Sequence, residues 1–208
     1  MYKKPALLIL ATALQACNVV TFTPPAIPAV GTATLNTANQ ATVITNGHTV
    51  TLPAQSGTWG VASSPVYANA TTLAGGSMTT YAIAMAGRQN GSYFAGYNGA
   101  GTSVPTTGSA ALLGEYYVVD GTGASNGIIG LSADFGTGTI AGIGGSGANA
   151  VSAAGSISGS DVTGTVTYKG NSGVWKGGFF VPPNSALTYE IMSGFTGTNF
   201  AGVISATQ

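Results

Sequence analysis

Titratable side chains are few in this chain of 208 residues, so those that could do chemistry can be taken one at a time. The single His, His48, follows an Asn-Gly pair and precedes a β-type run. A neutral imidazole is a competent axial ligand for haem iron, and a Tyr can supply the second position. A haem face needs apolar contact on both sides, whereas the neighbours of His48 are small and polar. We therefore predict an exposed turn His and no bound cofactor. The alternative, a haem carrier, would use His48 with one of Tyr67, Tyr81, Tyr93 and Tyr97.

Two carboxylates, Asp134 and Glu190, could in principle form the acid and base of a hydrolase. We expect instead that each bonds turn amides or a nearby lysine, such as Lys169 or Lys176. General acid–base catalysis needs paired titratable groups, and this chain offers few of them. The prediction is a protein that is not an enzyme, with no catalytic residue.

Two further motifs have an ordinary structural explanation. Residues 142–147 read GIGGSG, but a phosphate loop leads into a helix, and here β-type runs lie on both sides, so a hairpin loop is predicted. Four aromatic residues gather in the first half and suit either protein recognition or the core of a small domain: Tyr81, Tyr93, Phe94 and Tyr97.

Composition excludes several classes of protein. Charged residues make up 5% of the chain, against about 25% in an ordinary domain, so there is no basic surface for nucleic acid. The chain has one Cys, which excludes an intrachain disulfide and a Cys-based metal cluster. Hydrophobic residues at 44% are too plentiful for a disordered chain.

The N-terminal residues have the form of a secretion signal. Two lysines precede an apolar run from Ala6 to Leu14, which is too short to span a bilayer. Leu14-Gln15-Ala16-Cys17 then resembles the lipobox of bacterial lipoproteins. That resemblance implies a signal peptide over 1–16, cleavage after Ala16 and a lipid on Cys17, which would anchor the protein stably in a membrane. Asn18, rather than Asp, implies the outer membrane.

The remaining chain divides into three parts. Residues 17–42, rich in Pro and Thr, predict an extended tether. Residues 43–105 predict a small β-rich domain with irregular runs, including a hairpin in which Val43-Ile44 and residues 49–52 flank Asn46-Gly47. Further candidate strands there lie at 59–61, 66–67, 81–85 and 92–97.

Residues 106–208 predict eight antiparallel strands, because eight β-type runs alternate with short turns rich in Gly, Asn and Pro. The runs lie at 108–119, 126–135, 137–143, 149–158, 160–168, 172–181, 185–195 and 198–206. Such a series makes an up-and-down barrel or a sandwich, and closure into a barrel would remove edges that so few charges could not protect. In 172–181, Trp175 and Phe179 share one face while Lys176 and Phe180 share the other, which predicts a strand partly covered on its outer side.

This second half resembles the β-barrel domain of the transferrin-binding protein B and factor H-binding protein lipoproteins. The resemblance is carried by PTTGSA at 105–110, GEY at 114–116, LSADFGTGTIAG at 131–142, ISGSDVTGTV at 157–166, GGFFVPPNSALTYE at 177–190 and NFAGVI at 199–204. It implies an all-β fold in which an eight-stranded barrel follows a small β "handle" domain, and the handle often carries the partner contacts in that family.

The resemblance implies a surface-exposed, lipid-anchored protein of the bacterial outer membrane that binds a macromolecule, either a host protein or a source of iron or haem. We expect a monomer that binds no nucleic acid. The alternatives are the haem carrier described above and, as the least favoured, an integral outer-membrane barrel. The sequence shows no paired aromatic girdles of the kind that integral barrels carry.

Overall fold

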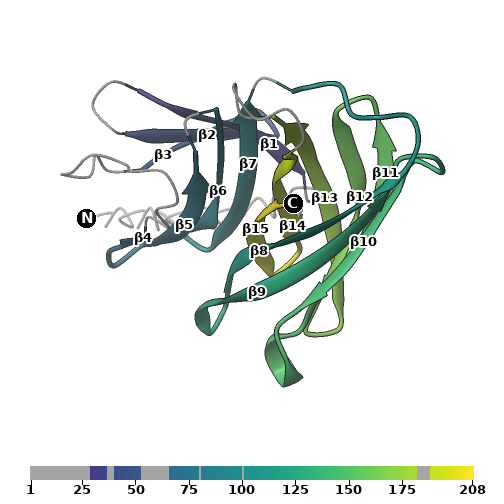
Figure 1. Cartoon of the computed structure of the whole chain (residues 1–208). Coiled ribbons are helices and arrows are strands. Elements are labelled where there is room, and N and C mark those ends of the chain that lie inside the picture. The colour runs from purple at the N-terminus through teal and green to yellow at the C-terminus, as the bar shows by residue number, and fades with distance from the viewer. Residues whose placement is uncertain (1–28, 37–39, 53–65, 80, 100, 182–187) are drawn as a thin grey trace, which may run out of the picture.

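The chain forms two connected β units, a seven-stranded sheet and a closed eight-stranded barrel (Figure 1). The all-β prediction is thus confirmed. The computed structural model describes residues 29–36, 40–52, 66–79, 81–99, 101–181 and 188–208. We call the first unit, strands β1 to β7, the handle sheet. Among the described residues, no helix has the length and hydropathy needed to cross a membrane.

The barrel is an up-and-down antiparallel barrel. Each strand pairs with the next along the chain, and β15 pairs with β8 to close the ring. The eight strands are β8 (Ser109–Asp120), β9 (Gly123–Asp134), β10 (Thr139–Gly144), β11 (Val151–Ser158), β12 (Asp161–Tyr168), β13 (Asn171–Phe180), β14 (Glu190–Gly197) and β15 (Phe200–Thr207). These bounds confirm the eight predicted runs, because short turns between alternating strands leave only antiparallel neighbours available.

The barrel interior is filled by apolar side chains, in the way that eight-stranded barrels allow. Trp175 and Phe179 of β13 lie in this core, as their shared face predicts. Phe135, Phe179 and Tyr189 pack together where β9 and β13 end, with ring centroids 5.5 to 6.5 Å apart. Tyr168, Phe195 and Phe200 do the same toward the opposite end.

Where the handle sheet does not cover it, the outer wall of the barrel is mostly small and polar. Its exposed larger apolar side chains are Leu113, Ile128 and Ile143. On β9, for example, Ile129, Leu131 and Ala133 point inward while Ser132 and Asp134 are exposed. An integral outer-membrane barrel has the opposite pattern, with an apolar outer band and a polar lumen. The burial pattern therefore argues against the integral-barrel interpretation.

The handle sheet has the strand order β3-β2-β1-β7-β6-β5-β4. Its strands are β1 (Val30–Leu35), β2 (Ala41–Thr45), β3 (His48–Thr51), β4 (Val66–Ala68), β5 (Thr72–Met78), β6 (Ala82–Gln89) and β7 (Ser92–Gly99). β1 pairs in parallel with β7, and all other neighbours are antiparallel. The predicted hairpin at Asn46-Gly47 is confirmed as β2 and β3, whereas β5 was not predicted and the candidate run 59–61 lies outside the described residues.

One predicted boundary was wrong. Residues 17–42 were expected to be an extended tether, but β1 lies inside that range and β2 begins at Ala41. β1 occupies the place between β2 and β7, so it joins a hairpin to the rest of the sheet. Its alternation is weak in the sequence because the residues on both of its faces are nearly all Thr, Ala and Gly. The strand is made by antiparallel pairing with β2 and by parallel pairing with distant β7.

Strands β1, β5, β6 and β7 of the handle sheet pack on the outer wall of the barrel. Ala82, Ala84 and Ala86 of β6 face the barrel and contact a cluster that includes Val203 and Met192, and these small side chains let the two sheets approach closely. Every residue of β14 is buried, because one side faces the barrel core and the other faces β6 and β7. The predicted outer cover on β13 is confirmed at Phe180, which is buried in the same cluster.

Tyr117 is the largest side chain of this joint. Its ring lies directly over Gly75 of β5, where an added Cβ would come within 2.6 Å of the ring carbon Cζ. The Tyr117 hydroxyl is buried without a hydrogen-bond partner among the described residues, and burial raises its pKa to about 12. The glycine at this position is thus a packing requirement that the sheet–barrel contact imposes.

Candidate functional site

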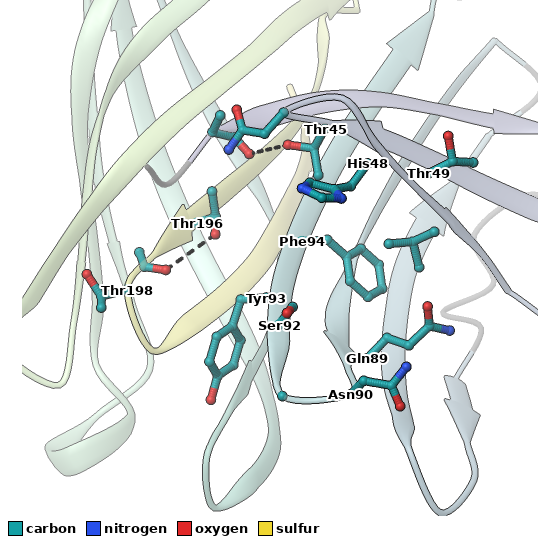
Figure 2. A pocket seen from close by; sticks show the side chains of 15 residues that line it. Thr45, His48, Thr49, Gln89, Asn90, Ser92, Tyr93, Phe94, Thr196 and Thr198 are labelled. Atoms are coloured by element: carbon teal, nitrogen blue, oxygen red, sulfur yellow. Dashed lines mark hydrogen bonds between the residues drawn. The ribbon is translucent and has the colours of Figure 1, made fainter. Parts of the chain in front are cut away.

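Three turns from separate strand pairs converge to form a groove with a volume of about 400 Å³ (Figure 2). They are the β2–β3 turn and the β6–β7 turn of the handle sheet and the β14–β15 turn of the barrel. We call this feature the three-turn groove. It is lined by Ala29, Thr45, Asn46, His48, Thr49, Val50, Gln89, Asn90, Gly91, Ser92, Tyr93, Phe94, Thr196, Gly197 and Thr198.

The two groove turns of the handle sheet are formed by the same dipeptide, Asn-Gly. Asn46-Gly47 has φ values of 49° and 75°, and Asn90-Gly91 has φ values of 50° and 81°. Positive φ at both central residues defines the tight hairpin turn that matches strand twist, and Asn-Gly is the pair that adopts it most readily. The Asn90-Gly91 turn was not predicted, although the same dipeptide between two β-type runs would have identified it.

Internal hydrogen bonds hold the floor of the groove. The Thr45 hydroxyl donates to the Ala29 carbonyl at 2.8 Å, which ties the start of the described chain to β2. The buried Thr196 hydroxyl donates to the Phe200 carbonyl at 3.4 Å and so closes the β14–β15 turn. Tyr93 is half-buried against the barrel-side cluster, while Phe94, the next residue on β7, is buried in the core of the handle sheet.

Charges near the groove are already engaged. The Arg88 guanidinium donates to the Gly121 carbonyl at 3.4 Å and thereby links the β6–β7 turn to the β8–β9 turn. Asp120 and Lys169 form a salt bridge at 2.7 Å. Burial acts to raise the pKa of Asp120, but hydrogen bonds from Lys169 and Thr122 outweigh it and lower that pKa to about 2.

His48 is exposed at the start of β3 and lines the three-turn groove, as the prediction of an exposed turn His requires. Of the four Tyr residues considered as second haem ligands, Tyr93 lines the same groove. Tyr67 is buried in the handle core, Tyr81 lies at the other end of β6, and Tyr97 packs toward the barrel.

The groove does not fit a haem. Most of its described lining residues carry a hydroxyl, amide or imidazole group. Of its larger apolar side chains, Phe94 is buried with its neighbours and Val50 is half-buried, which leaves the ring of Tyr93 as one apolar wall. A flat apolar ring needs apolar walls on both faces, and this lining supplies no second wall.

The aromatic residues of the first half serve mainly as core. Phe94 is buried in the handle core, and Tyr93 and Tyr97 pack against the barrel-side cluster. Tyr81 is the exposed member, at 37%. Of the two interpretations left open by the sequence, the small-domain core therefore applies to most of this set, and a recognition role is left to Tyr81 and to the open side of Tyr93.

The two carboxylates lie in unlike environments. Asp134 accepts hydrogen bonds from the Thr137 and Gly136 amides at 3.0 and 2.9 Å, and these bonds lower its pKa. The prediction that it bonds turn amides is confirmed. Glu190 does not follow that prediction: it is buried at the start of β14, where burial raises its pKa and a hydrogen bond from Thr79 partly opposes the rise.

The glycine-rich stretch at 142–147 ends β10 and leads through a three-residue turn of 3₁₀-helix into β11, so the predicted hairpin loop is confirmed. Asn149 in this loop accepts a hydrogen bond from the Tyr116 hydroxyl at its carbonyl, 3.0 Å away. The loop thus covers one end of the barrel.

Cys17, the predicted lipid site, lies outside the described residues. Within the described part of the chain, no three His, Cys, Asp or Glu side chains gather in a way that could hold a metal ion.

No family model matches the chain, and no curated protein matches it. Solved structures do. The chain is similar to HpuA from Kingella denitrificans, solved in complex with human haemoglobin, with 13% identity, coverage of 85% of this chain and 90% of HpuA, and a TM-score of 0.52. A structure described as a surface lipoprotein matches with 15% identity, coverage of 88% and 99%, and a TM-score of 0.48.

Transferrin-binding protein B from Neisseria meningitidis matches with 15% identity and a TM-score of 0.47, over 79% of this chain and 38% of that one. The chain thus spans about two fifths of that protein. At 13% identity the likeness to HpuA shows the fold alone: the chain has an HpuA-like fold that includes an eight-stranded barrel.

Proposed function

We propose that this protein is a non-enzymatic lipoprotein of the bacterial cell surface that binds a host protein through the three-turn groove and its rim. The observation that carries the proposal is the groove itself. Turns from the handle sheet and from the barrel meet there and present neutral polar groups beside Tyr93. Polar groups with an aromatic anchor are typical of protein recognition surfaces.

The barrel acts as the scaffold in this proposal. Its interior is filled by a continuous apolar core that includes Trp175, Phe179 and Phe195, so recognition takes place on the outside of the molecule. Binding residues are commonly found on turns that a rigid scaffold positions, and all three groove turns join strands of the two sheets. The similar HpuA structure contains human haemoglobin, which makes a protein ligand a reasonable first candidate here.

The partner can be tested by capture from host plasma and from haemoglobin-containing lysate, followed by measurement of affinity for the purified candidate. A matched pair of variants assigns the surface. Tyr93→Leu keeps the apolar contact with the barrel but removes the ring from the groove, whereas Thr165→Val changes an exposed side chain on the far wall of the barrel. We expect weaker binding only for Tyr93→Leu. Equal affinity of both variants would exclude the groove as the binding surface.

Attachment to the membrane is a separate part of the proposal and rests on the lipobox residues Leu14 to Cys17. Cys17→Ser should abolish labelling by radioactive palmitate and release the protein from the membrane fraction. Protease treatment of intact cells should degrade the wild-type protein if it faces outward. Normal acylation of Cys17→Ser would remove the lipid anchor from the proposal.

The haem-carrier alternative is tested in the same preparation. Titration of the purified protein with haemin should give no sharp Soret shift, because the groove lacks the apolar walls that a haem requires. A stoichiometric complex that is lost in His48→Ala would replace protein binding with haem carriage as the function.

A further inference from the structure

Three of the five exposed large apolar side chains among the described residues lie together on one wall of the barrel. They are Leu113 of β8, Ile128 of β9 and Ile143 of β10, with exposed fractions of 66%, 65% and 75%. Leu113 and Ile143 pair with Gly130 from its two sides, and Ile128 lies two residues before Gly130 on the same face. Neighbouring strands are about 4.8 Å apart, so the Cα atoms of the three residues lie within about 10 Å of one another. We call these three residues the apolar wall patch.

The apolar wall patch projects from a low wall. At Gly130, in its middle, an added Cβ would meet nothing within 4 Å. The outward neighbours Ala111, Ser132 and Ala141 are small. Three projecting side chains around a notch leave gaps against a rigid surface, and atoms that face a gap lose their van der Waals contacts. A fluid layer of acyl chains fills such gaps, so the shape of the patch suits a deformable apolar partner.

The charge of this wall excludes electrostatic attraction by an anionic surface. Strands β8 to β11, all of whose residues the structure describes, contain no Lys, Arg or His. Of their acids, Asp120 is paired with Lys169, and Asp134 accepts hydrogen bonds from turn amides. Glu115 pairs with Ile128 across the strands, and its exposed carboxylate must stay hydrated. Contact of the patch with a membrane is therefore apolar and shallow.

The size of the patch favours a membrane over a second copy of the chain. Burying one Leu or Ile removes about 60–120 Å² of apolar surface from water, so the patch offers at most about 360 Å². A stable interface between two copies buries about 800 Å² on each. A protein that a lipid already holds at the membrane needs much less, because the anchor keeps the effective concentration of the second contact high.

The position of the patch agrees with the proposed lipid on Cys17. Twelve residues separate Cys17 from Ala29, which allows a reach of about 40 Å at most. Val30 lies on the wall of β14, where its Cγ1 is 3.0 Å from a Cβ added at Gly194. β10 is four strands from β14 around the ring, or about 20 Å, so the anchor can reach the patch side of the barrel.

We propose that the apolar wall patch docks into the lipid layer that holds Cys17, and that this contact turns the handle sheet and the three-turn groove away from the membrane. The handle strands β6 and β7 cover β14, and Figure 1 shows β10 on the side of the barrel away from the handle sheet. The inference rests on the proposed function, because the lipid on Cys17 supplies the membrane. It adds the orientation in which the groove faces a partner from outside.

The test uses the full acylated protein in phosphatidylcholine vesicles that contain a lipid with a nitroxide near the headgroup. Cys17 is the only Cys in the sequence and carries the lipid, so an added Cys takes a fluorophore selectively. One reporter is Ser132→Cys, which lies beside the intact patch, and the other is Thr49→Cys, which is exposed on the handle sheet.

Two variants are compared with the Ser132→Cys reporter in place. The patch variant carries Leu113→Thr, Ile128→Thr and Ile143→Thr, and threonine keeps the preference for a strand. The control variant carries Ser152→Thr, Ala154→Thr and Ser158→Thr, which are exposed on β11.

We expect strong quenching at Ser132→Cys in the wild-type background and in the control variant, and weak quenching at Thr49→Cys. The patch variant should shift the equilibrium between docked and undocked protein at least about 10-fold toward the undocked form, because each buried Leu or Ile contributes about that factor or more. Equal quenching in the patch variant, equal quenching at the two reporters, or loss of quenching in high salt would overturn the proposal. So would a concentration-dependent dimer that the patch variant lacks, which would assign the patch to a second copy.

The patch variant also separates this inference from the proposed function. It keeps Cys17 and the groove, so it should still incorporate palmitate and still bind the captured host protein. Normal acylation and partner binding with unchanged quenching would refute the docking surface and retain the proposed function. Wild-type protein without a lipid would refute the anchor. Vesicle flotation of that unacylated protein would then decide for the patch if the patch variant lost flotation, and against it if the wild type did not float.

Discussion

The barrel and the handle sheet are made from the same small, polar and weakly charged residues, yet they cover their strand edges and apolar faces in different ways. In the barrel every strand pairs with its neighbour along the chain, and the ring closes on itself between β8 and β15. In the handle sheet β1 pairs in parallel with β7, about 65 residues later, and both edge strands, β3 and β4, are short. The closed ring protects its own hydrogen bonds, whereas the open sheet depends on the barrel to cover one of its faces.

This difference is visible in the side chains. The barrel core contains large residues such as Trp175, Tyr168 and Phe195. The face of the handle sheet that meets the barrel is built on Ala82, Ala84, Ala86 and Ala95, which fix the distance between the layers. The alternation of apolar and polar residues along each strand therefore specifies the barrel strands, whereas the handle sheet is specified largely by its contact with the barrel surface. The four predictions below would break or sharpen this contrast, from the largest expected effect to the smallest.

The largest effect is expected from removing a barrel-core side chain. Trp175→Ala should lower the free energy of unfolding by about 3–5 kcal/mol, because the closed wall around this fully buried ring cannot collapse into the cavity. Phe94→Ala in the handle core should cost less, toward about 3 kcal/mol, because an open sheet can relax at its edges. Urea denaturation followed by intrinsic fluorescence and circular dichroism measures both. A larger loss for Phe94→Ala would contradict the contrast.

The joint between the two units comes next. Gly75→Val should cost about 1–3 kcal/mol, since its Cβ would overlap the buried ring of Tyr117, which packs the sheet on the barrel. The matched control is Gly130→Val on the exposed barrel wall, where an added Cβ meets nothing within 4 Å. Thermal melts of the two variants are compared with the wild type. If Gly75→Val had the same melting temperature as Gly130→Val, the Tyr117 contact would not hold the two units together.

A smaller effect is expected at the charged end of the barrel. Asp120→Asn should lower stability by about 1 kcal/mol at pH 7, because a partly exposed ion pair is screened by solvent. The folded-state pKa of Asp120 is lowered to about 2, so its contribution is complete above the ordinary value of 3.8 and is lost as the pH falls toward 2. Unfolding measured at pH 7 and at pH 2 should show the two proteins converge in acid. A gap of the same size at both values would show that the carboxylate charge is not the cause.

The smallest effect is expected in the pH dependence of stability. It comes from Glu190 at the start of β14, whose carboxyl is hydrogen-bonded by the side chain of Thr79, just after β5. Burial raises the pKa of this group, so the folded state favours the protonated form, and stability is lost as the pH rises from the ordinary value of 4.5 through the raised value. Glu190→Gln should remove that loss and be the more stable protein at pH 8, with little difference at pH 4.

The control for this variant is Glu115→Gln, whose side chain is exposed on the barrel wall. Denaturation midpoints at the two pH values give the slope for each protein. The role assigned to Glu190 fails if its variant keeps the wild-type pH slope.

The sequence by itself determined the eight antiparallel strands of the second half, although their pattern alone was compatible with either a barrel or a sandwich. Strands joined by short connections can only fold back on one another, and four of the seven barrel connections have two residues. The period of two and the positions of Gly, Asn and Pro were therefore sufficient to predict eight strands within a few residues. The inward face of 172–181 and the amide bonds of Asp134 were also predictable, because both depend on neighbours close in the chain. His48 was placed correctly as an exposed turn residue for the same reason.

Only the tertiary structure decided the rest. β1 pairs with its neighbour β2 and also, in parallel, with distant β7, and nothing within Val30–Leu35 marks that second partner. Glu190 is buried, and Tyr93 and Phe94 face different cores, because of how the handle sheet lies on the barrel. The three-turn groove joins residues from 29 to 198, which meet through packing between layers. Contacts over such sequence separations leave no local period or spacing in the sequence. The binding site that we propose therefore could not be predicted from the sequence.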